Sequence, residues 1–151
     1  DGIRDYKVTG VQTCALPIYP IEHKYVEESG TMNLMFLIGN TLVTPNTSET
    51  ILAGVTRDSV VQVAKHWGYN VEERKISVTE VVEAHNNGTL KEMFGTGTAA
   101  TIAHIAMFHN NGTNYELPPV ENRELSNKIS AYLDELKRAN VKDPFGWVTK
   151  V

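Results

Sequence analysis

Short apolar segments that end at turn residues run through most of this chain, and they set the strongest limit on its fold. In residues 32–45 an apolar run ends at a Gly-Asn pair and then returns, which is the pattern of a β-hairpin. An Asn-Gly pair within residues 109–115 predicts a second hairpin turn. The other strand candidates are residues 23–30, 70–76, 90–94 and 100–108, and residues 51–55 are a further short apolar run that leads into a predicted helix.

Three segments have the spacing of apolar residues that is typical of helices: 56–68, 77–88 and 121–140. Thr56 is the expected N-cap of the first helix and Thr79 that of the second, because a threonine hydroxyl can accept a bond from a free helix amide. Strand and helix candidates alternate along the chain. The sequence therefore predicts a mixed α/β (α+β) fold.

The composition argues against a nucleic-acid-binding protein, a membrane-spanning protein and a metal site. The 151 residues include 14 basic and 18 acidic side chains and have a net charge of −4, which argues against a nucleic-acid surface because such a surface needs a basic patch. The longest apolar run, residues 34–38, is far shorter than the roughly 20 residues of a membrane span. Cys14 is the only cysteine, and the five histidines lack metal-ligand spacing. We expect a cytoplasmic protein without a metal site.

Two segments have the character of anion sites. Residues 95–100, "GTGTAA", match the G-x-G-x-x-A form of the dinucleotide fingerprint, but the apolar, β-branched segment that follows leaves little room for the required helix. The alternative is a glycine-rich turn between strands, whose backbone N–H groups could hold a carboxylate or phosphate. At residues 53–57, "AGVTR", the first amides of a helix could hold a phosphate, or Thr56 could simply cap that helix.

Four motifs, taken together and in order, resemble the branched-chain amino acid aminotransferases, a pyridoxal-phosphate (PLP) family of fold type IV. They are "VEESGTMN" (26–33), "LAGVTRDSV" (52–60), "EMFGTGTAA" (92–100) and "DPFGW" (143–147). The resemblance implies the C-terminal domain of that fold, truncated at its N-terminal side. It implies a homodimeric enzyme that moves an amino group between Leu, Ile or Val and 2-oxoglutarate.

Other classes stay open at this stage. A D-amino-acid aminotransferase or an aminodeoxychorismate lyase has the same fold type, and much of the pocket that would distinguish them lies upstream of the matching region. A non-catalytic anion-binding module is the alternative from another class. The paired acids at residues 27–28 could likewise be no more than a solvated strand end.

The resemblance also implies roles for individual residues. Glu28 resembles the acid that pairs with the PLP pyridine nitrogen, and Thr31 resembles the threonine beside the cofactor ring. The resemblance therefore implies that Glu28 and Thr31 bind the cofactor, and that Glu28 is not merely part of a solvated strand end.

Further roles fall on the two candidate anion segments. Val55 and Thr56 resemble the helix-start pair whose backbone holds the PLP phosphate, and Thr98 resembles a further phosphate contact. The turn formed by Thr98 and Ala99 resembles the one whose amides receive the substrate carboxylate. Ala53 departs from the family, which usually has proline there.

The start of the chain departs from the family most. The Schiff-base lysine of the family lies upstream of the stretch that matches Tyr19, so the resemblance implies a fragment without its catalytic lysine. Translated back into codons, residues 1–5 and 8–18 resemble a common short-read sequencing adapter. We therefore expect residues 1–18 to be a non-native extension and residues 19–151 to be the C-terminal part of the PLP-binding domain.

Overall fold

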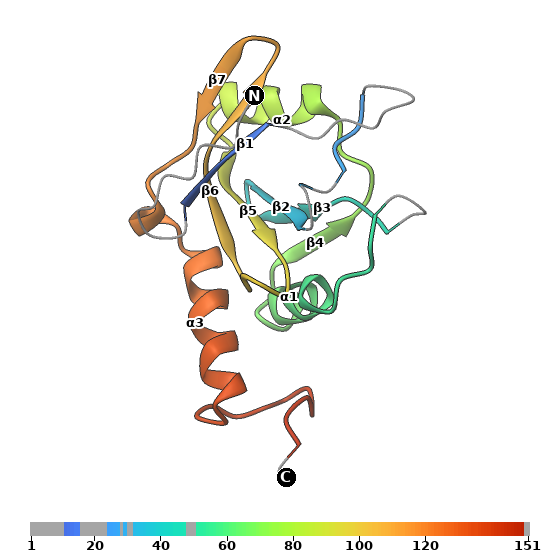
Figure 1. The fold of residues 1–151 in the computed structure, drawn as a ribbon, viewed down its shortest axis with the longest axis vertical. Helices are drawn as coiled ribbons and strands as arrows, with labels where there is room; N and C mark the ends of the chain where they lie inside the picture. The colour runs from blue at the N-terminus through green and yellow to red at the C-terminus, as the bar shows by residue number, and fades with distance from the viewer. Residues whose placement is uncertain (1–10, 16–23, 28, 30–31, 48–50, 150–151) are drawn as a thin grey trace.

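A computed structural model describes residues 11–15, 24–27, 29, 32–47 and 51–149. They form one seven-stranded sheet with the strand order β1-β6-β5-β2-β3-β4, and β7 pairs with β6 (Figure 1). The elements are β1 (Val11–Ala15), β2 (Asn33–Ile38), β3 (Thr41–Thr44), α1 (Val55–His66), β4 (Asn70–Glu73), α2 (Val78–Asn86), β5 (Leu90–Thr96), β6 (Ala103–Asn110), β7 (Thr113–Glu116), the 3₁₀ turn η1 (Val120–Asn122) and α3 (Leu125–Lys137).

Both predicted hairpins are confirmed. β2 and β3 pair antiparallel across a turn in which Gly39 has a φ of 61°. β6 and β7 pair antiparallel across Asn111 and Gly112, with φ values of 48° and 77°. Both positive φ values at Asn-Gly suit the two-residue turn whose twist matches that of the strands. Because β3 and β4 run parallel with α1 as their crossover, the sheet is mixed and the α/β prediction is confirmed.

The helix starts differ from the predictions. The cap of α1 is Gly54, with extended backbone angles, and Thr56 lies inside the first turn, so the predicted Thr56 cap is wrong. The cap of α2 is Ser77, whose hydroxyl accepts a 3.0 Å bond from the Glu80 N–H, so the predicted Thr79 cap is wrong as well. In each case the true cap is the nearest upstream residue with extended backbone angles, which a cap needs and a helical residue lacks.

One strand prediction is also wrong. Among the described residues of 23–30 there are only isolated bridges, one between Tyr25 and Ser77 and one between Ser29 and Met32. Residues 51–54, most of the short apolar run noted in the sequence, form a loop with a single bridging position before α1 begins at Val55. The predicted third helix is shorter than 121–140, because extended angles at Arg123 separate η1 from α3.

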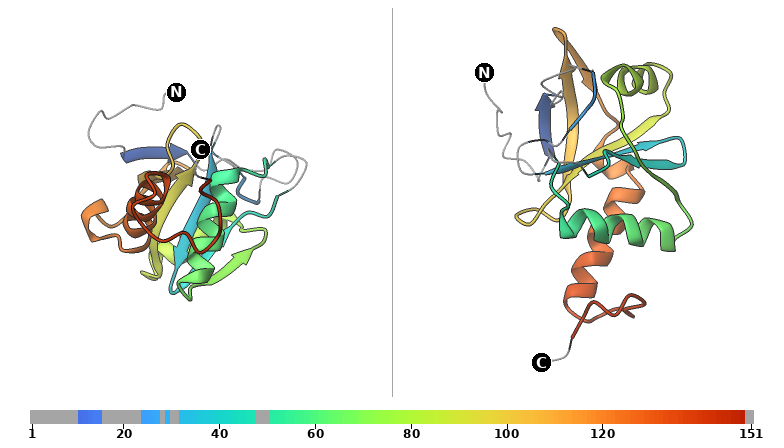
Figure 2. Two further views of the ribbon diagram at one scale, coloured as in Figure 1. Left: turned by 90° about the horizontal axis from the view of Figure 1, so that it is seen from below. Right: turned by 90° about the vertical axis from the view of Figure 1, so that its right-hand side faces the viewer.

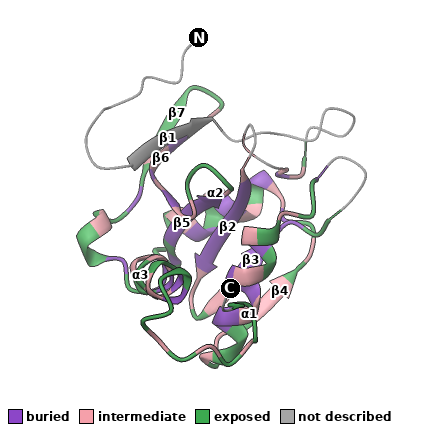
Figure 3. Cartoon of the chain, turned by 60° about the horizontal axis from the view of Figure 1, so that its bottom comes forward, coloured by how far each residue is buried: buried purple, intermediate pink, exposed green. Residues whose placement is uncertain are grey.

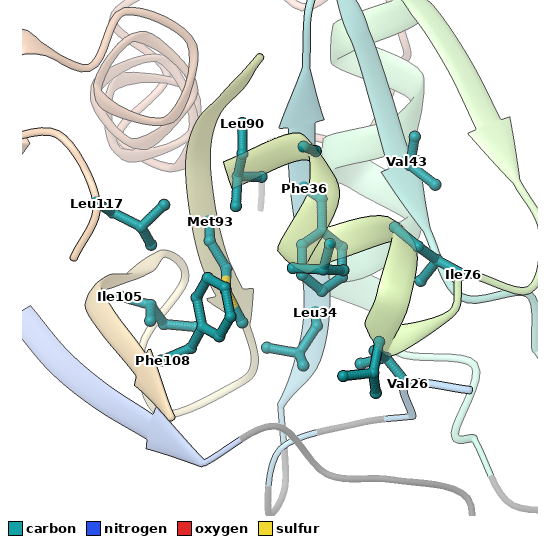
Figure 4. Packing of buried hydrophobic residues seen from close by; sticks show 13 residues of the cluster. Val26, Leu34, Phe36, Val43, Ile76, Leu90, Met93, Ile105, Phe108 and Leu117 are labelled. Atoms are coloured by element: carbon teal, nitrogen blue, oxygen red, sulfur yellow. The ribbon is translucent and has the colours of Figure 1, made fainter. Parts of the chain in front are cut away.

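The sheet has a core on each face. α2 covers one face, over a cluster that includes Leu34, Phe36 and Met93, and Figure 4 shows these three side chains together in its middle. α1 and α3 cover the other face, where Phe94 packs (Figure 2). Figure 3 shows buried residues concentrated along the central strands β2 and β5. Successive residues of β5, Met93 and Phe94, therefore pack into opposite cores.

The sequence predicted no element before residue 19, whereas the structure has a strand there. β1 runs parallel to β6, with a register shift between Gln12 and Thr13. Ladder bonds of this kind use main-chain groups that nearly every sequence offers, and a sheet edge accepts any strand that can reach it. The pairing therefore leaves the origin of residues 1–18 undecided.

A buried arginine joins β5 to β6 where their ladder stops. The pairing of these strands ends at Phe94 opposite His104. Beyond that point the Arg123 side chain, only 3% exposed, donates bonds of 3.1 Å to the Met93 carbonyl and 2.7 Å to the Ile105 carbonyl. A third bond of 3.0 Å reaches the Pro118 carbonyl. The guanidinium thus replaces the next rung of the sheet.

A buried carboxylate fixes α3 beside this arginine. Glu92 on β5 is 2% exposed, and its two oxygens accept 2.8 Å bonds from the N–H groups of Leu125 and Ser126. A negative charge at a helix N-terminus is favourable because the first amides lack partners within the helix. Glu92 therefore caps a helix that begins 33 residues later in the chain.

Replacing Arg123 with methionine should lower the free energy of unfolding by at least about 3 kcal/mol, because three carbonyls lose their donor and each buried unpaired group costs about 1–3 kcal/mol. Urea unfolding followed by circular dichroism measures this loss. Arg138→Met is the matched control, since the Arg138 side chain is 69% exposed and, among the described residues, bonds to Glu135 alone, and it should change stability by less than about 0.5 kcal/mol. Equal losses in the two variants would contradict the bridging role of Arg123.

Candidate functional site

The two predicted anion segments meet in space. The Thr56 hydroxyl of α1 lies 3.5 Å from the carbonyl oxygen of Gly97, which is 41 residues away in the chain. Figure 2 shows the turn between β5 and β6 beside the start of α1. The predicted residues Val55, Thr56, Thr98 and Ala99 therefore belong to one region of the molecule.

The start of α1 has free backbone donors. Gly54 makes no side-chain cap bond, and the first amide with an acceptor inside the helix is that of Asp58, which bonds to the Gly54 carbonyl at 3.0 Å. In the described part of the chain, the N–H groups of Val55 and Thr56 have no acceptor. The Val55 residue is 84% exposed, so a ligand can approach this end of the helix. Free amides and the helix dipole favour an anion here.

The turn between β5 and β6 supplies a second set of donors. It is closed by a 3.1 Å bond from the Gly97 N–H to the Ala100 carbonyl. Thr98 and Ala99 between them are exposed, and within the described ranges their amides have no acceptor. A strand, not a helix, follows this turn, so the dinucleotide interpretation is wrong and the strand-to-strand turn is confirmed.

A buried hydroxyl lies at the end of β5. Thr96 is 1% exposed, and its Oγ1 has no hydrogen-bond partner among the described residues. Thr96 pairs directly with Asn33 across the antiparallel ladder, so the two side chains share a face of the sheet. Asn33 contacts the loop before α1, and the unpaired hydroxyl therefore lies on the same face as the start of that helix.

Sequence reasoning missed the role of Arg57, although it lies within a quoted motif. Its side chain is buried and donates bonds of 2.9 Å to the Pro45 carbonyl and 3.1 Å to a Glu73 oxygen. Lys65 bonds to the other Glu73 oxygen at 3.3 Å. Burial raises the pKa of Glu73, but the bonds from the two cations outweigh it and the pKa is lowered. Arg57 thus ties the first turn of α1 to the ends of β3 and β4.

Two predicted site residues, Glu28 and Thr31, lie outside the described residues. Within the described ranges no group of three His, Cys, Asp or Glu side chains could hold a metal ion. The same ranges contain no helix long and apolar enough to cross a membrane.

A cavity of about 260 Å³ lies at the opposite end of the sheet from these motifs. It is lined by the turn at Gly39 and Asn40 and by polar side chains that include Tyr69 and Glu124. Burial raises the pKa of Tyr69, and the charges of Glu124 and Glu92 raise it further. None of the predicted site residues lines this cavity.

Comparison with known proteins identifies the family of this chain. Residues 18–108 match the family described as "Amino-transferase class IV". The chain belongs to the class IV aminotransferases. Among these aminotransferases, it is 42% identical over 131 residues to branched-chain-amino-acid aminotransferase 2 of Bacillus subtilis, an alignment that covers 87% of this chain and 36% of that protein. A probable branched-chain-amino-acid aminotransferase of Streptomyces coelicolor is 41% identical over 137 residues, covering 91% of this chain and 37% of that protein.

A solved structure of the family has the same fold. The branched-chain amino acid aminotransferase of Escherichia coli superimposes with a TM-score of 0.64 at 26% identity, covering 83% of this chain and 39% of that one. The predicted fold type is therefore confirmed. The chain spans little more than a third of the length of its curated relatives.

Replacing Arg57 with methionine should destabilise the chain by about 2 kcal/mol, because the buried Pro45 carbonyl and the Glu73 carboxylate lose their donor. Lys65→Met is the matched control, since the two cations share the acceptor Glu73 but the Lys65 side chain is 53% exposed. We expect this control to cost less than about 0.5 kcal/mol. Urea unfolding of both variants makes the comparison, and a Lys65 effect as large as the Arg57 effect would show that burial does not decide the contribution.

Proposed function

We propose that residues 19–151 are the C-terminal, cofactor-binding part of a PLP-dependent branched-chain aminotransferase. The whole enzyme would move an amino group between Leu, Ile or Val and 2-oxoglutarate. The observation that carries the proposal is the 3.5 Å distance between the Thr56 hydroxyl and the Gly97 carbonyl, because it brings the start of α1 and the turn between β5 and β6 together and both segments have unpaired amides.

The residues present fit a phosphate-bearing cofactor. The unpaired amides of Val55 and Thr56 would hold the phosphate of PLP, and the Thr98 side chain would add a contact. The Thr96 hydroxyl, buried and without a described partner, is a further donor at the same end of β5. When bound, PLP withdraws electrons from the substrate Cα, and the protein contributes binding, orientation and charge.

The other roles follow the resemblance. We propose that Glu28 pairs with the pyridine nitrogen, Thr31 lies beside the ring, and the Thr98 and Ala99 amides receive the substrate carboxylate. A carboxylate beside a pyridine nitrogen keeps that nitrogen protonated, since a nearby opposite charge favours the charged form. We also propose that the full-length enzyme is a cytoplasmic homodimer that acts on small molecules, as the family resemblance implies.

We propose that this chain alone has no aminotransferase activity, because the Schiff-base lysine of the family lies upstream of the matching region. Four described lysines are engaged away from the site: Lys24 and Lys75 lie over Tyr25, Lys128 lies over Trp67, and Lys65 pairs with Glu73. Lys137 is the lysine to monitor, since its amino group lies 2.7 Å from the Thr101 hydroxyl beside the turn.

The function is tested by fusing the upstream part of the Bacillus subtilis relative to residue 19. The chimera should bind PLP and transaminate Leu, Ile and Val, whereas the chain alone should show no turnover and no borohydride-reducible adduct at Lys137. In the chimera, Glu28→Gln should lower kcat on the order of 100-fold with little change in substrate affinity, because it removes a charge that acts mainly in the transition state.

Glu27→Gln in the same chimera is the control, since it removes the same charge from the neighbouring acid, which does not match the position of the acid that pairs with the pyridine nitrogen. If Glu27→Gln is crippling and Glu28→Gln mild, the acid at the cofactor is Glu27. A chimera that folds but fails to bind PLP would overturn the proposed function.

We further propose that residues 1–18 are not native to this protein. Deleting them should change the free energy of unfolding by less than about 2 kcal/mol, because β1 is an edge strand whose pairing depends on main-chain groups. Urea unfolding of residues 19–151 and of the whole chain provides the measurement. A loss as large as that from core damage would show that the segment belongs to the fold.

A further inference from the structure

Asn33 lies between the two halves of the candidate site. It is the first residue of β2 and is 6% exposed. Its backbone pairs with Thr96, the last residue of β5 before the Gly97–Ala100 turn. Its side chain reaches the other half, because Nδ2 donates a 2.9 Å bond to the Leu52 carbonyl in the loop before α1.

The loop is folded tightly around this contact. The Leu52 carbonyl accepts a second 2.9 Å bond, from the Gly54 N–H two residues later. A Cβ on Gly54 would overlap the Asn33 Oδ1 atom, so only glycine permits the helix cap to come this close to β2. The next two residues, Val55 and Thr56, are those with unpaired amides.

We propose that Asn33 is a positioning residue, which holds the start of α1 at the distance from the β5–β6 turn where both sets of free amides reach one phosphate-bearing ligand. The inference rests on the proposed function, because it concerns the same site. Asn33 itself need not touch the ligand. Its side-chain Nδ2 holds the loop by bonding to the Leu52 carbonyl, and its Oδ1 packs directly against Gly54.

Asparagine suits this position because it carries a donor and an acceptor on one short, uncharged side chain. Aspartate has the same shape but would set a carboxylate against the Leu52 carbonyl, without a donor, and would place a negative charge near an anion site. Alanine removes both contacts without adding charge. Asn33→Ala is therefore the informative change.

The test uses the 151-residue chain and backbone amide NMR, with PLP, pyridoxal and inorganic phosphate as probes. In the wild type, PLP and phosphate should shift the amides of Val55 and Thr56, which the proposed function assigns to the phosphate, and pyridoxal should leave these two amides unmoved. Asn33→Ala should raise the Kd for PLP at least about tenfold, by analogy with the loss of an outer-shell partner at a metal site. Asn70→Ala is the matched control, because Asn70 is an exposed strand asparagine remote from these motifs, and its Kd should equal that of the wild type.

Gly54→Ala tests the same geometry from the other side. Its new Cβ would displace the cap from Asn33, so the Kd for PLP should rise by a similar factor. In the double variant with Asn33→Ala the overlap is gone, and the second substitution should add little. This non-additivity is expected of two residues that act through one contact, and it would be absent if they acted at separate places.

The outcomes separate the two proposals. If the wild-type amides respond to phosphate and neither Asn33→Ala nor Gly54→Ala weakens PLP binding, the positioning role is overturned and the proposed function stands. If PLP and phosphate leave the wild-type amides unmoved, the proposed function fails and the positioning role fails with it.

Discussion

The guanidinium of Arg123 holds β5 and β6 together, and the placement of the turn between them follows from it. It donates to carbonyls of both strands where their ladder has ended, so the strands converge toward the Gly95–Ala103 pair and diverge toward Arg123. Burial lowers the pKa of Arg123, while the charge of Glu92 acts in the opposite direction. Burial and the Arg123 charge also lower the pKa of His104, the residue on the last rung. Neutral His104 is therefore favoured beside a charged arginine.

These contacts determine where the two segments of the candidate site lie. Ladder hydrogen bonds join β5 and β6 next to the turn between them, and Arg123 joins the two strands farther along. The position of the turn at the ends of these strands is therefore fixed. Glu92 anchors α3 on the same face, next to α1. α1 is held independently, by Arg57 at its first turn and by Asn33 of β2, which donates a bond to the loop before the helix. The unpaired amides thus lie on elements whose positions are set by buried polar groups elsewhere.

Sequence patterns predicted the parts that depend on neighbouring residues. The hairpins follow from Gly39-Asn40 and Asn111-Gly112, because the positive φ values of Gly39, Asn111 and Gly112 are a local property of those residues. The helix segments follow from apolar spacing, although their caps do not: Thr56 has a capping side chain, but the extended backbone belongs to Gly54. The family resemblance, which rests on the order of the motifs, also predicted that Thr56 and Thr98 belong to one site. The structure brings their two segments together.

The long-range bonds of Glu92, Arg123 and Asn33 could not be predicted from the sequence, for a physical reason. Glu92 and Leu125 are 33 residues apart, as Arg123 and Met93 are 30 apart, and a carboxylate in an alternating strand looks like a solvated residue until its partners are known. Asn33 was missed in the same way, since its acceptor is 19 residues away. Long-range bonds of this kind leave no periodic signal in the chain.

A crystal structure of the fusion between residues 19–151 and the upstream part of the Bacillus subtilis relative, grown with PLP, would show whether the free amides at the start of α1 hold the phosphate group. We expect phosphate oxygens about 3 Å from the backbone nitrogens of Val55 and Thr56, with the Gly97–Ala100 turn against the same ligand. A phosphate bound elsewhere, with the Val55 and Thr56 amides facing solvent, would contradict this arrangement.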